Sequence, residues 1–406
     1  MRRESADSRS SDGTSLRTGN ASVNADHPRI FINDTTLRDG EQAPGVAFSA
    51  SDKLAIARAL DGAGVDEIEA GTPAMGADEV EAIAGIAAAG LKCKVMAWCR
   101  LTTDDVDAAL RAGVAHVNIS APMSRLQIGV KLKTDVDGVA ERVRAVVAYA
   151  RSRELGVALG GEDSSRADPR DIGRILRAAQ AEGAQRYRFA DTLGLLDPFS
   201  TYESIRRVRE ETDLPIEFHG HDDVGLATAN TLAAIRAGAA HASVTVLGLG
   251  ERAGNAALEE VAMALGHVAR GRTAIRPETL QGLAKIVARA ARRNVGRAKA
   301  IVGSDIFTHE SGIHVAALLK DARTYQGLDP AVLGRRNRIV IAKHSGLAAI
   351  QGKCAEMGVD IDKGAAGRLL AQVKRRAEAK RAPVSRRELL ALIEGARREE
   401  LFGGAS

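Results

Sequence analysis

Cysteine is scarce in this sequence of 406 residues, which contains only three, and they are scattered along the chain. None of Cys93, Cys99 and Cys354 belongs to a CxxC pair. A disulfide framework, or a closed structural zinc site, needs more thiols at regular spacing than this chain offers. The sequence therefore predicts a protein of a reducing compartment, and we expect a cytoplasmic location.

Aromatic residues and long apolar runs are scarce as well. Aromatics make up 3% of the chain, with Trp98 as the single tryptophan, whereas nucleic-acid binding usually combines clustered basic residues with stacking aromatics. We therefore interpret the net charge of +5 as a solvated surface that attracts small anions, and we expect no nucleic-acid partner. No apolar run approaches the roughly 20 residues that span a bilayer, and none follows the basic N-terminus as in a signal peptide. We expect no membrane partner.

Three regions differ in pattern. Residues 1–28 are rich in Ser, Asp, Asn and Arg without an apolar period, and they are predicted to form a disordered extension. Residues 29–270 alternate short β-branched or apolar runs with Ala-, Arg- and Glu-rich stretches of helical period. Residues 271–406 lack this alternation and are predicted to be mainly helical.

The alternation predicts eight strands, over residues 30–33, 66–70, 94–98, 116–120, 157–161, 187–190, 216–219 and 242–247. It also predicts eight helices, over residues 51–63, 76–89, 103–112, 138–153, 169–181, 198–211, 228–237 and 256–269. Eight such pairs favour an α/β fold of the TIM (β/α)₈ barrel type over an open doubly wound sheet. The first strand also lacks the glycine-rich turn of a doubly wound nucleotide-binding fold, since DTTLRDGEQ follows it.

A candidate metal site lies at the predicted carboxyl ends of the strands, where barrels of this class carry their active sites. His219 and His221 end the seventh strand, and side chains two apart on a strand share one face. Asp39, just after the first strand, can add a carboxylate. Asn255, after the eighth, can add an amide oxygen or cap the following helix. Such a mixed set predicts a Mg²⁺ or Mn²⁺ site, with Zn²⁺ as a further option.

Other reactive residues are expected at the same rim. Arg38 can hold a carboxylate or stabilise an oxyanion, although a salt bridge at the rim explains such an arginine equally well. Gln42 can add a hydrogen bond to a substrate. Glu162, at the end of the fifth strand, is a candidate acid or base, and Thr192, after the sixth, is a candidate binder of a carboxylate.

Seven longer motifs run through the chain after residue 28. They are DTTLRDGEQ (34–42), GGEDSSR (160–166), ADTLG (190–194), HGHDDVGLATANT (219–231), GLGERAGNAALEEV (248–261), HESGIHVAALLK (309–320) and GRRNRIVIAKHSG (334–346). In content and order they resemble the homocitrate synthase and 2-isopropylmalate synthase family of metal-dependent barrels. Coincidence does not explain motifs of this length, which span most of the chain.

The resemblance implies an acyltransferase that condenses acetyl-CoA with a 2-oxo acid. Asp39, His219 and His221 match the family's metal ligands, and Asn255 lies in the motif that approaches the metal. Arg38 matches the arginine that polarises the carbonyl of the 2-oxo acid. A divalent metal is therefore the implied cofactor.

The resemblance also assigns roles outside the metal site. Glu162 and Thr192 match acid/base and substrate-binding positions, and His314 with Tyr325 matches the pair that helps to deprotonate the acetyl methyl group. His309 is a weaker alternative, one turn before His314 if this stretch is helical. The C-terminal region of such enzymes reaches into the barrel of the partner subunit, so a homodimer is implied.

The acceptor is expected to be 2-oxoglutarate. The stretches AWCR (97–100), GGEDSSRAD (160–168) and HDDVGLATANTLAA (221–234) resemble the homocitrate synthases of nitrogen fixation, whose product completes the nitrogenase cofactor. The long regulatory domain of leucine-pathway isopropylmalate synthases is not expected in the residues after Lys343. Ala158 and Gly160 depart from the lysine-pathway enzymes, which carry Arg and Ser at these places.

Several rival activities share parts of this pattern. A 2-isopropylmalate or citramalate synthase would use 2-oxoisovalerate or pyruvate as the acceptor with the same residues. A hydroxymethylglutaryl-CoA lyase would share the barrel and the two histidines, but we would not expect it to carry the motifs from His309 to Gly346. A metal-dependent hydrolase would usually need more ligands and would not depend on CoA.

Overall fold

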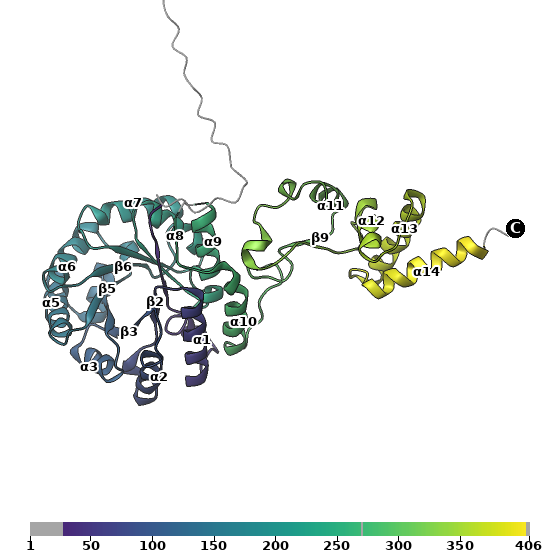
Figure 1. Ribbon diagram of the computed structural model, residues 1–406. Helices are drawn as coiled ribbons and strands as arrows, with labels where there is room; N and C mark the ends of the chain where they lie inside the picture. Colours follow the sequence, from purple (N-terminus) through teal and green to yellow (C-terminus); the bar gives the residue numbers. More distant parts are fainter. Residues whose placement is uncertain (1–26, 269–270, 403–406) are drawn as a thin grey trace, which may run out of the picture. The chain divides into compact units, whose positions relative to one another are not determined.

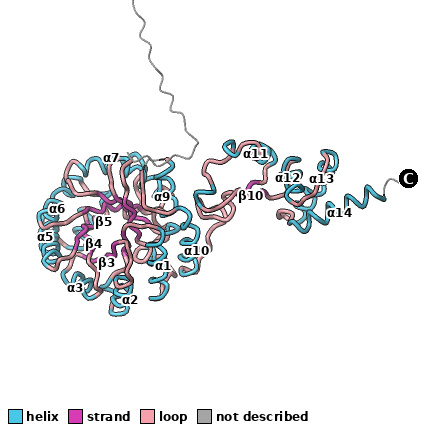
Figure 2. The backbone as a smooth tube through the Cα atoms, viewed as in Figure 1, coloured by secondary structure: helices cyan, strands magenta, loops and turns pink. Residues whose placement is uncertain are grey.

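The computed structural model of this protein describes residues 27–268 and 271–402 (Figure 1). Within these ranges, eight parallel strands close into a barrel in sequence order. They are β1 (Phe31–Asp34), β2 (Glu67–Glu69), β3 (Lys94–Arg100), β4 (His116–Pro122), β5 (Gly156–Glu162), β6 (Arg186–Asp191), β7 (Ile216–Gly220) and β8 (His241–Val244). Figure 2 shows these strands inside a ring of helices, which confirms the predicted α/β barrel.

The ring contains α1 (Ala50–Ala63), α2 (Ala77–Ala87), α3 (Thr103–Arg111), the single turn α4 (Arg125–Gln127), α5 (Val136–Ser152), α6 (Pro169–Ala181), α7 (Pro198–Arg209), α8 (Ala227–Arg236), α9 (Leu258–His267) and α10 (Leu280–Ala290). Local sequence explains their ends. Asp168 and Asp197 cap α6 and α7, each followed by a proline at the first helical position. Gly64, with φ of 91°, ends α1 in a left-handed conformation that favours glycine.

Two predicted elements near the end of the barrel are shorter than expected. β8 stops at Val244 instead of residue 247, because a short 3-10 helix, Val246–Gly248, turns the chain away. The last ring helix was predicted over 256–269 but begins at Leu258, because Asn255 and Ala257 still make β-bridges to His221 and Thr245. The end predicted at residue 269 lies outside the described residues.

Alternate residues of each strand point in opposite directions. One set packs against the helices and is apolar, for example Ile68, Leu159 and Phe218, all fully buried. The other set fills the barrel interior and is unusually polar, with five buried charged residues, Glu67, Glu69, Arg186, Arg188 and Glu217. The main apolar core therefore lies between strands and helices, while the interior carries charge.

The barrel unit extends beyond the predicted boundary at residue 270. Its contacts include residues up to Phe307, together with Ala331–Arg335. The physical reason is α10, which packs against α1 and buries Leu283 and Val287. The predicted extension 1–28 lies outside the described residues except for its last two positions.

A second compact unit contains most residues after Phe307. Its elements are β9 (Thr308–His309), α11 (Gly312–Leu318), β10 (Arg338–Ile339), α12 (Leu347–Glu356), α13 (Lys363–Lys380) and α14 (Arg386–Phe402). Ile350, Cys354, Leu369 and Val373 form the centre of its apolar core. The C-terminal region is thus mainly helical, as predicted, with one short parallel pair of strands, β9 and β10. No helix of the described ranges is both long and apolar enough to cross a membrane.

Candidate active site

Three predicted metal ligands meet at the carboxyl end of the barrel. Asp39 follows β1, His219 lies in β7, and His221 comes directly after β7. One potential ligand atom of each lies within 4.8 Å of the others. The two Nε2 atoms are 3.2 Å apart, and Nε2 of His219 is 3.7 Å from Oδ2 of Asp39. All three side chains are buried, so they face one another instead of solvent.

The protonation states of the three groups suit a cation. Burial lowers the pKa of His219 to about 3, and burial also lowers the pKa of His221. Burial alone would raise the pKa of Asp39, but Arg38, the two histidines and a hydrogen bond from Asn255 lower it to about 2. At neutral pH the cluster therefore consists of two neutral imidazoles and one carboxylate, the forms that bind metal ions.

Neighbouring polar groups hold the ligands in place. Nδ1 of His219 lies 3.1 Å from Oγ of Ser243 on β8, which fixes the ring orientation. Nδ2 of Asn255 donates to Oδ1 of Asp39 at 2.7 Å and to the carbonyl of Leu249 at 3.1 Å. Asn255 does not cap α9, whose N-cap is Ala257. Its buried Oδ1 has no partner among the described residues, and rotation of the amide would turn this oxygen toward the cluster.

A divalent metal ion matches this donor set. Two imidazole nitrogens and a carboxylate oxygen converge in a buried place, with the unpartnered Asn255 oxygen close by. Mixed nitrogen and oxygen ligands from three side chains leave further coordination positions for a chelating substrate. The roles of Asp39, His219, His221 and Asn255 as ligands remain predictions that this geometry favours.

Arg38 lies beside the cluster. Its Nη1 donates to Oδ2 of Asp39 at 2.9 Å, and its Nε donates to Oε2 of Glu69 at 2.7 Å. The guanidinium carbon is also 5.6 Å from the ring centre of Trp98. Arg38 therefore forms salt bridges of the kind expected for an arginine at the barrel rim, but its two partners, Asp39 and Glu69, belong to the site itself.

Glu69 connects Arg38 to the charged interior of the barrel. Glu69 accepts hydrogen bonds from Thr35, Asn118 and Arg188, at 2.7, 3.0 and 2.8 Å. Arg188 also pairs with Glu217 at 2.8 Å, and Glu217 pairs with Arg186 at 2.6 Å. The charges of both acids are stabilised, since the nearby arginines outweigh burial and lower the pKa values of Glu69 and Glu217. These five interior charges were not among the predicted site residues.

A sequence signal for the interior charges exists. The strands containing them have charged residues at every second position, as in Glu67 and Glu69 or Arg186 and Arg188. Alternation of this kind usually indicates a strand with one face in solvent. In a closed barrel the second face points to the interior, so the same pattern indicates a buried ionic network.

Three other predicted residues lie at the same end of the barrel. Glu162 ends β5, is partly exposed, and accepts a 2.5 Å hydrogen bond from Nζ of Lys131. Thr192 follows β6, and its Oγ1 accepts from the backbone N–H of Asp163 at 2.8 Å. Gln42 ends a short 3-10 helix after β1 and is exposed. Their catalytic and binding roles remain predictions.

The remaining three predicted residues belong to the second unit. His314, on α11, is exposed, and its ring stacks on that of Tyr325 with centroids 4.2 Å apart. His309 is not one helical turn before His314, because it lies in β9 and the helix begins only at Gly312. Its Nε2 is 3.3 Å from Oδ1 of Asn337 instead. The structure thus pairs His314 with Tyr325 and places His309 in a strand outside helix α11.

Comparison with solved structures agrees with the barrel. A crystal structure of hydroxymethylglutaryl-CoA lyase from Pseudomonas aeruginosa matches with a TM-score of 0.59 and 24% identity. The match covers 66% of this chain and 95% of the lyase. At 24% identity this similarity shows that the two proteins share a fold.

Comparison of sequences identifies the family. The HMGL-like family model matches residues 29–287, and the model described as homocitrate synthase post-HMGL domain-like matches residues 301–381. A 2-isopropylmalate synthase 2 from Caldanaerobacter subterraneus is 44% identical, over 90% of this chain and 95% of the relative. Homocitrate synthase from Frankia alni is 48% identical over 79% of this chain and 92% of the relative, and homocitrate synthase 1 from Nostoc is 42% identical over 90% and 97%. This chain therefore belongs to the HMGL-like family and combines its barrel with a region of the homocitrate synthase post-HMGL type.

Proposed function

We propose that this protein is a homocitrate synthase, an acyltransferase that condenses acetyl-CoA with 2-oxoglutarate and releases homocitrate and CoA. The observation that carries the proposal is the buried cluster of Asp39, His219 and His221 with Arg38 beside it. Homocitrate synthases are among its relatives at 42% and 48% identity, and its C-terminal region matches the homocitrate synthase type. Its product would then serve nitrogenase cofactor synthesis.

The cluster residues would hold Mg²⁺ or Mn²⁺, with Zn²⁺ as a further option. When bound, the metal supplies Lewis-acid polarisation of the 2-oxo carbonyl. Arg38 donates hydrogen bonds to the same oxygen and stabilises the alkoxide that forms there. Its bonds to Glu69 and Asp39 fix the guanidinium before the substrate arrives, so little reorganisation is needed during the reaction.

The chain offers two kinds of base for the acetyl methyl group. Glu162 lies at the end of β5, and the pair of His314 and Tyr325 lies on the second unit. The base removes one methyl proton, and the resulting carbanion forms a C–C bond to the carbonyl carbon of the oxo acid. Water then cleaves the thioester, so one acetyl-CoA, one 2-oxoglutarate and one water give homocitrate and CoA. Thr192 and Gln42 would bind the acceptor's carboxylate.

We also propose a homodimer in which the C-terminal region of one subunit completes the active site of the other. His314 is exposed, as are the neighbouring Ile313 and Leu319, at 78% and 53%. Large apolar side chains are also exposed in the segments that follow barrel strands, among them Val130, Phe199 at the start of α7, and Val224. Exposed apolar surfaces of this kind are typical of regions that another chain covers.

A mixing experiment tests this arrangement. His219→Ala and His314→Ala variants should each be inactive, and the mixed proteins should regain part of the activity after subunit exchange. A monomer in light scattering, or no recovery in a mixture shown to contain heterodimers, would contradict the proposal.

The substrate is tested by CoA release from acetyl-CoA with Mg²⁺ or Mn²⁺ and a panel of 2-oxo acids, before and after chelation. Chelator-sensitive release that is fastest with 2-oxoglutarate supports homocitrate synthesis. Faster release with 2-oxoisovalerate or pyruvate would move the protein to 2-isopropylmalate or citramalate synthesis, the second candidates, which the 44% identical 2-isopropylmalate synthase 2 keeps open. Release with none of the acids would refute the condensation itself.

A further inference from the structure

Asp163 has an unusual backbone conformation directly after Glu162, the last residue of β5. Its φ of 58° and ψ of 35° place it in the left-handed region, which glycine adopts readily and other residues rarely adopt. Aspartate tolerates this region better than most residues, but the conformation still costs free energy. It persists only where the surrounding structure holds it. The contacts of Asp163 therefore show what fixes the chain at the end of β5.

The side chain of Asp163 is fully buried and joins two segments at the carboxyl end of the barrel. Its Oδ1 accepts from Nε of Arg166 at 2.8 Å, and its Oδ2 accepts from Nη2 of the same arginine at 2.7 Å. Oδ2 also accepts from Oγ of Ser124, which lies in the segment after β4. The carbonyl of Glu162 accepts from the backbone N–H of Met123 in that segment at 2.9 Å. The carboxylate thus fastens the end of β5 to the chain that follows β4.

The backbone N–H of Asp163 connects this turn to a third segment. It donates to Oγ1 of Thr192, the residue directly after β6, at 2.8 Å. A hydroxyl group that accepts a hydrogen bond still carries its own hydrogen. Within residues 27–268 and 271–402, no group accepts a hydrogen bond from Oγ1 of Thr192. This hydrogen is therefore available to an acceptor outside the chain, such as a carboxylate oxygen.

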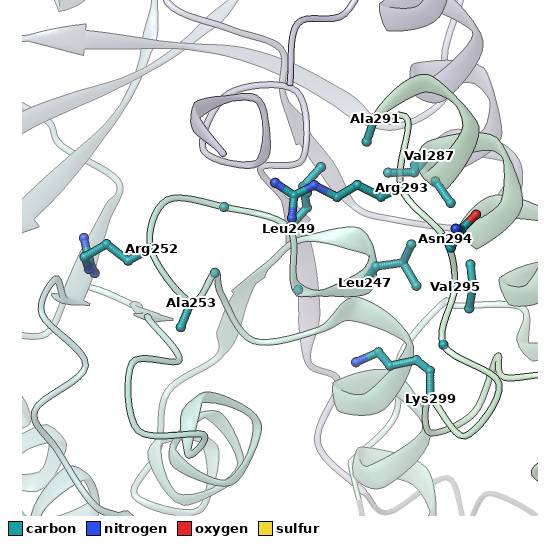
Figure 3. A pocket seen from close by; sticks show the side chains of 15 residues that line it. Leu247, Leu249, Arg252, Ala253, Val287, Ala291, Arg293, Asn294, Val295 and Lys299 are labelled. Carbon is teal, nitrogen blue, oxygen red and sulfur yellow. The ribbon is translucent and has the colours of Figure 1, made fainter. Parts of the chain in front are cut away.

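A second contact holds the backbone of Thr192. Nη2 of Arg252 donates to the carbonyl of Thr192 at 2.7 Å, and the same guanidinium pairs with Asp223 at 2.8 Å. Arg252 belongs to the glycine-rich loop 248–254, which lines a cavity of about 230 Å³. Figure 3 shows its side chain extending from this loop away from Lys299, which lines the same cavity. The carbonyl of Thr192 is therefore fixed independently of its hydroxyl group.

We propose that Asp163 is a positioning residue that makes Thr192 a hydrogen-bond donor to the acceptor's carboxylate. The inference rests on the proposed function, in which Thr192 binds that group. Because the N–H of Asp163 occupies one side of Oγ1, the hydroxyl hydrogen must point to another side, away from Asp163. The bond from Arg252 limits movement of the residue as a whole. The hydroxyl is thus directed before the acceptor arrives, and such pre-organisation favours binding.

The side chain of Asp163 controls this N–H through the backbone. While Arg166 and Ser124 bind its carboxylate, the residue keeps the left-handed conformation. Alanine would lose these bonds and disfavour positive φ, so a flip of the preceding peptide would relieve the strain and turn the N–H away from Thr192. Glycine would lose the same bonds but adopts a φ of 58° without penalty. The two substitutions therefore separate the direction of the backbone from the bonds of the side chain.

The test combines two substitutions of Asp163 with one of Thr192 in the full-length protein with Mg²⁺. Asp163→Ala should raise the KM for the preferred 2-oxo acid about tenfold, because Thr192 loses its direction, whereas Asp163→Gly should raise it less than about threefold. The KM for acetyl-CoA should stay within about twofold of the wild-type value in both variants. Thr192→Val removes the hydroxyl, so adding Asp163→Ala to it should raise the acceptor KM by less than about twofold more.

Asp171→Ala is a matched control for the loss of a buried carboxylate. Asp171 lies on α6 and accepts from Nε and Nη2 of Arg125 at 2.7 and 3.3 Å. In the described part of the chain it makes no hydrogen bond to Thr192. Urea unfolding of Asp171→Ala should show a loss of stability, while the KM for the acceptor stays within about twofold of the wild-type value.

Equal acceptor KM values in Asp163→Ala and Asp163→Gly would overturn the proposal, because the direction of the backbone would then not matter. A full tenfold effect of Asp163→Ala in the Thr192→Val background would also overturn it, since the effect would not pass through the hydroxyl. If the wild-type protein releases no CoA with any acceptor, the proposed function fails, and binding of 2-oxo acids is measured instead.

The fluorescence of Trp98 reports that binding, since it is the single tryptophan and its ring centre lies 5.6 Å from the guanidinium carbon of Arg38. Weaker binding by Asp163→Ala than by Asp163→Gly, with wild type the tightest, would still support the positioning role. Equal affinity of the two variants, or no binding by the wild type, would overturn it.

Discussion

Replacement of Glu69 by glutamine should slow the condensation without removing the metal. The change keeps the size of the side chain but removes its negative charge. Oε2 of Glu69 accepts from Nε of Arg38 at 2.7 Å and Oε1 accepts from Arg188 at 2.8 Å, in a place where the side chain is only 1% exposed. Glutamine offers one acceptor oxygen and an N–H₂ group, so one of these two arginines must face a donor.

The expected loss follows from the strength of these bonds. A hydrogen bond between charged groups contributes about 1.5–3 kcal/mol. If Arg38 loses this anchor, the same amount is lost from the stabilisation of the developing alkoxide, which corresponds to a fall in kcat of about 10- to 100-fold. Among the described residues, Glu69 makes its hydrogen bonds to Thr35, Arg38, Asn118 and Arg188 and not to the ligand atoms of the cluster, so metal affinity should change little.

A matched control is available on the same strand. Glu67 lies two residues before Glu69, also points into the barrel, and pairs with Arg186 rather than with Arg38. Glu67→Gln also leaves a buried arginine short of one anionic partner, but burial and the nearby Glu217 raise the pKa of Glu67 whereas the pKa of Glu69 is lowered, so Glu67→Gln should destabilise the fold less than Glu69→Gln. Steady-state kinetics, urea unfolding and Mn²⁺ titration of both variants would separate the effects on rate, stability and metal binding.

The reasoning would be refuted if the two variants had the same kcat. Equal losses of rate would mean that Glu69 acts through general stability of the barrel. A loss of Mn²⁺ affinity in Glu69→Gln that accounts for the whole fall in rate would show that Glu69 supports the metal ligands, not Arg38.

Four further predictions concern the site and the strand β1 beside it. His219→Ala should abolish metal binding and turnover together. Arg38→Ala should keep the metal but lower kcat about 10²- to 10³-fold, as metal titration and kinetics would show. Near-normal rates in either variant would contradict the assigned roles. Gly250→Ala places a Cβ 2.2 Å from Nδ2 of Asn255, so we expect about 10-fold weaker Mn²⁺ binding, and unchanged affinity would mean that this contact is not needed. Burial raises the pKa of Asp34 from 3.8 to about 7, so the folded state keeps a proton that the unfolded state has released. The stability that this protonated carboxyl contributes is full below about pH 4 and is lost as the pH rises through 7, by at most about 1.4 kcal/mol per pH unit. Asp34→Asn should therefore flatten the dependence of unfolding free energy on pH, measured by urea unfolding between pH 5 and 8. An equal slope in the variant and the wild type would contradict this role of Asp34.

The architecture of the barrel was predictable because its signals are local. Alternating apolar runs and helical periods, with caps such as Asp168 and stops such as Gly64, depend on neighbouring residues alone. The same local signals were misleading where tertiary contacts override them. Asparagine is a residue type that often caps helices, but a β-bridge to His221 keeps the backbone of Asn255 extended and its side chain at the cluster. His309 lies in a short strand rather than in the helix of His314, because it pairs with Ile339 in β10.

The sequence by itself determined the closed barrel, and it brought Asp39, His219 and His221 to one end, because strand ends converge in such a fold. Only the tertiary structure decided what surrounds them. The interior network that leads from Arg38 through Glu69 to Arg188 joins strands far apart in the chain. Thr192 is likewise held by Asp163 and Arg252, which belong to two other segments of the chain. Sequence patterns report the period of one element at a time, whereas ion pairs and cavities arise between elements, so their partners are set by distances that only the folded chain defines.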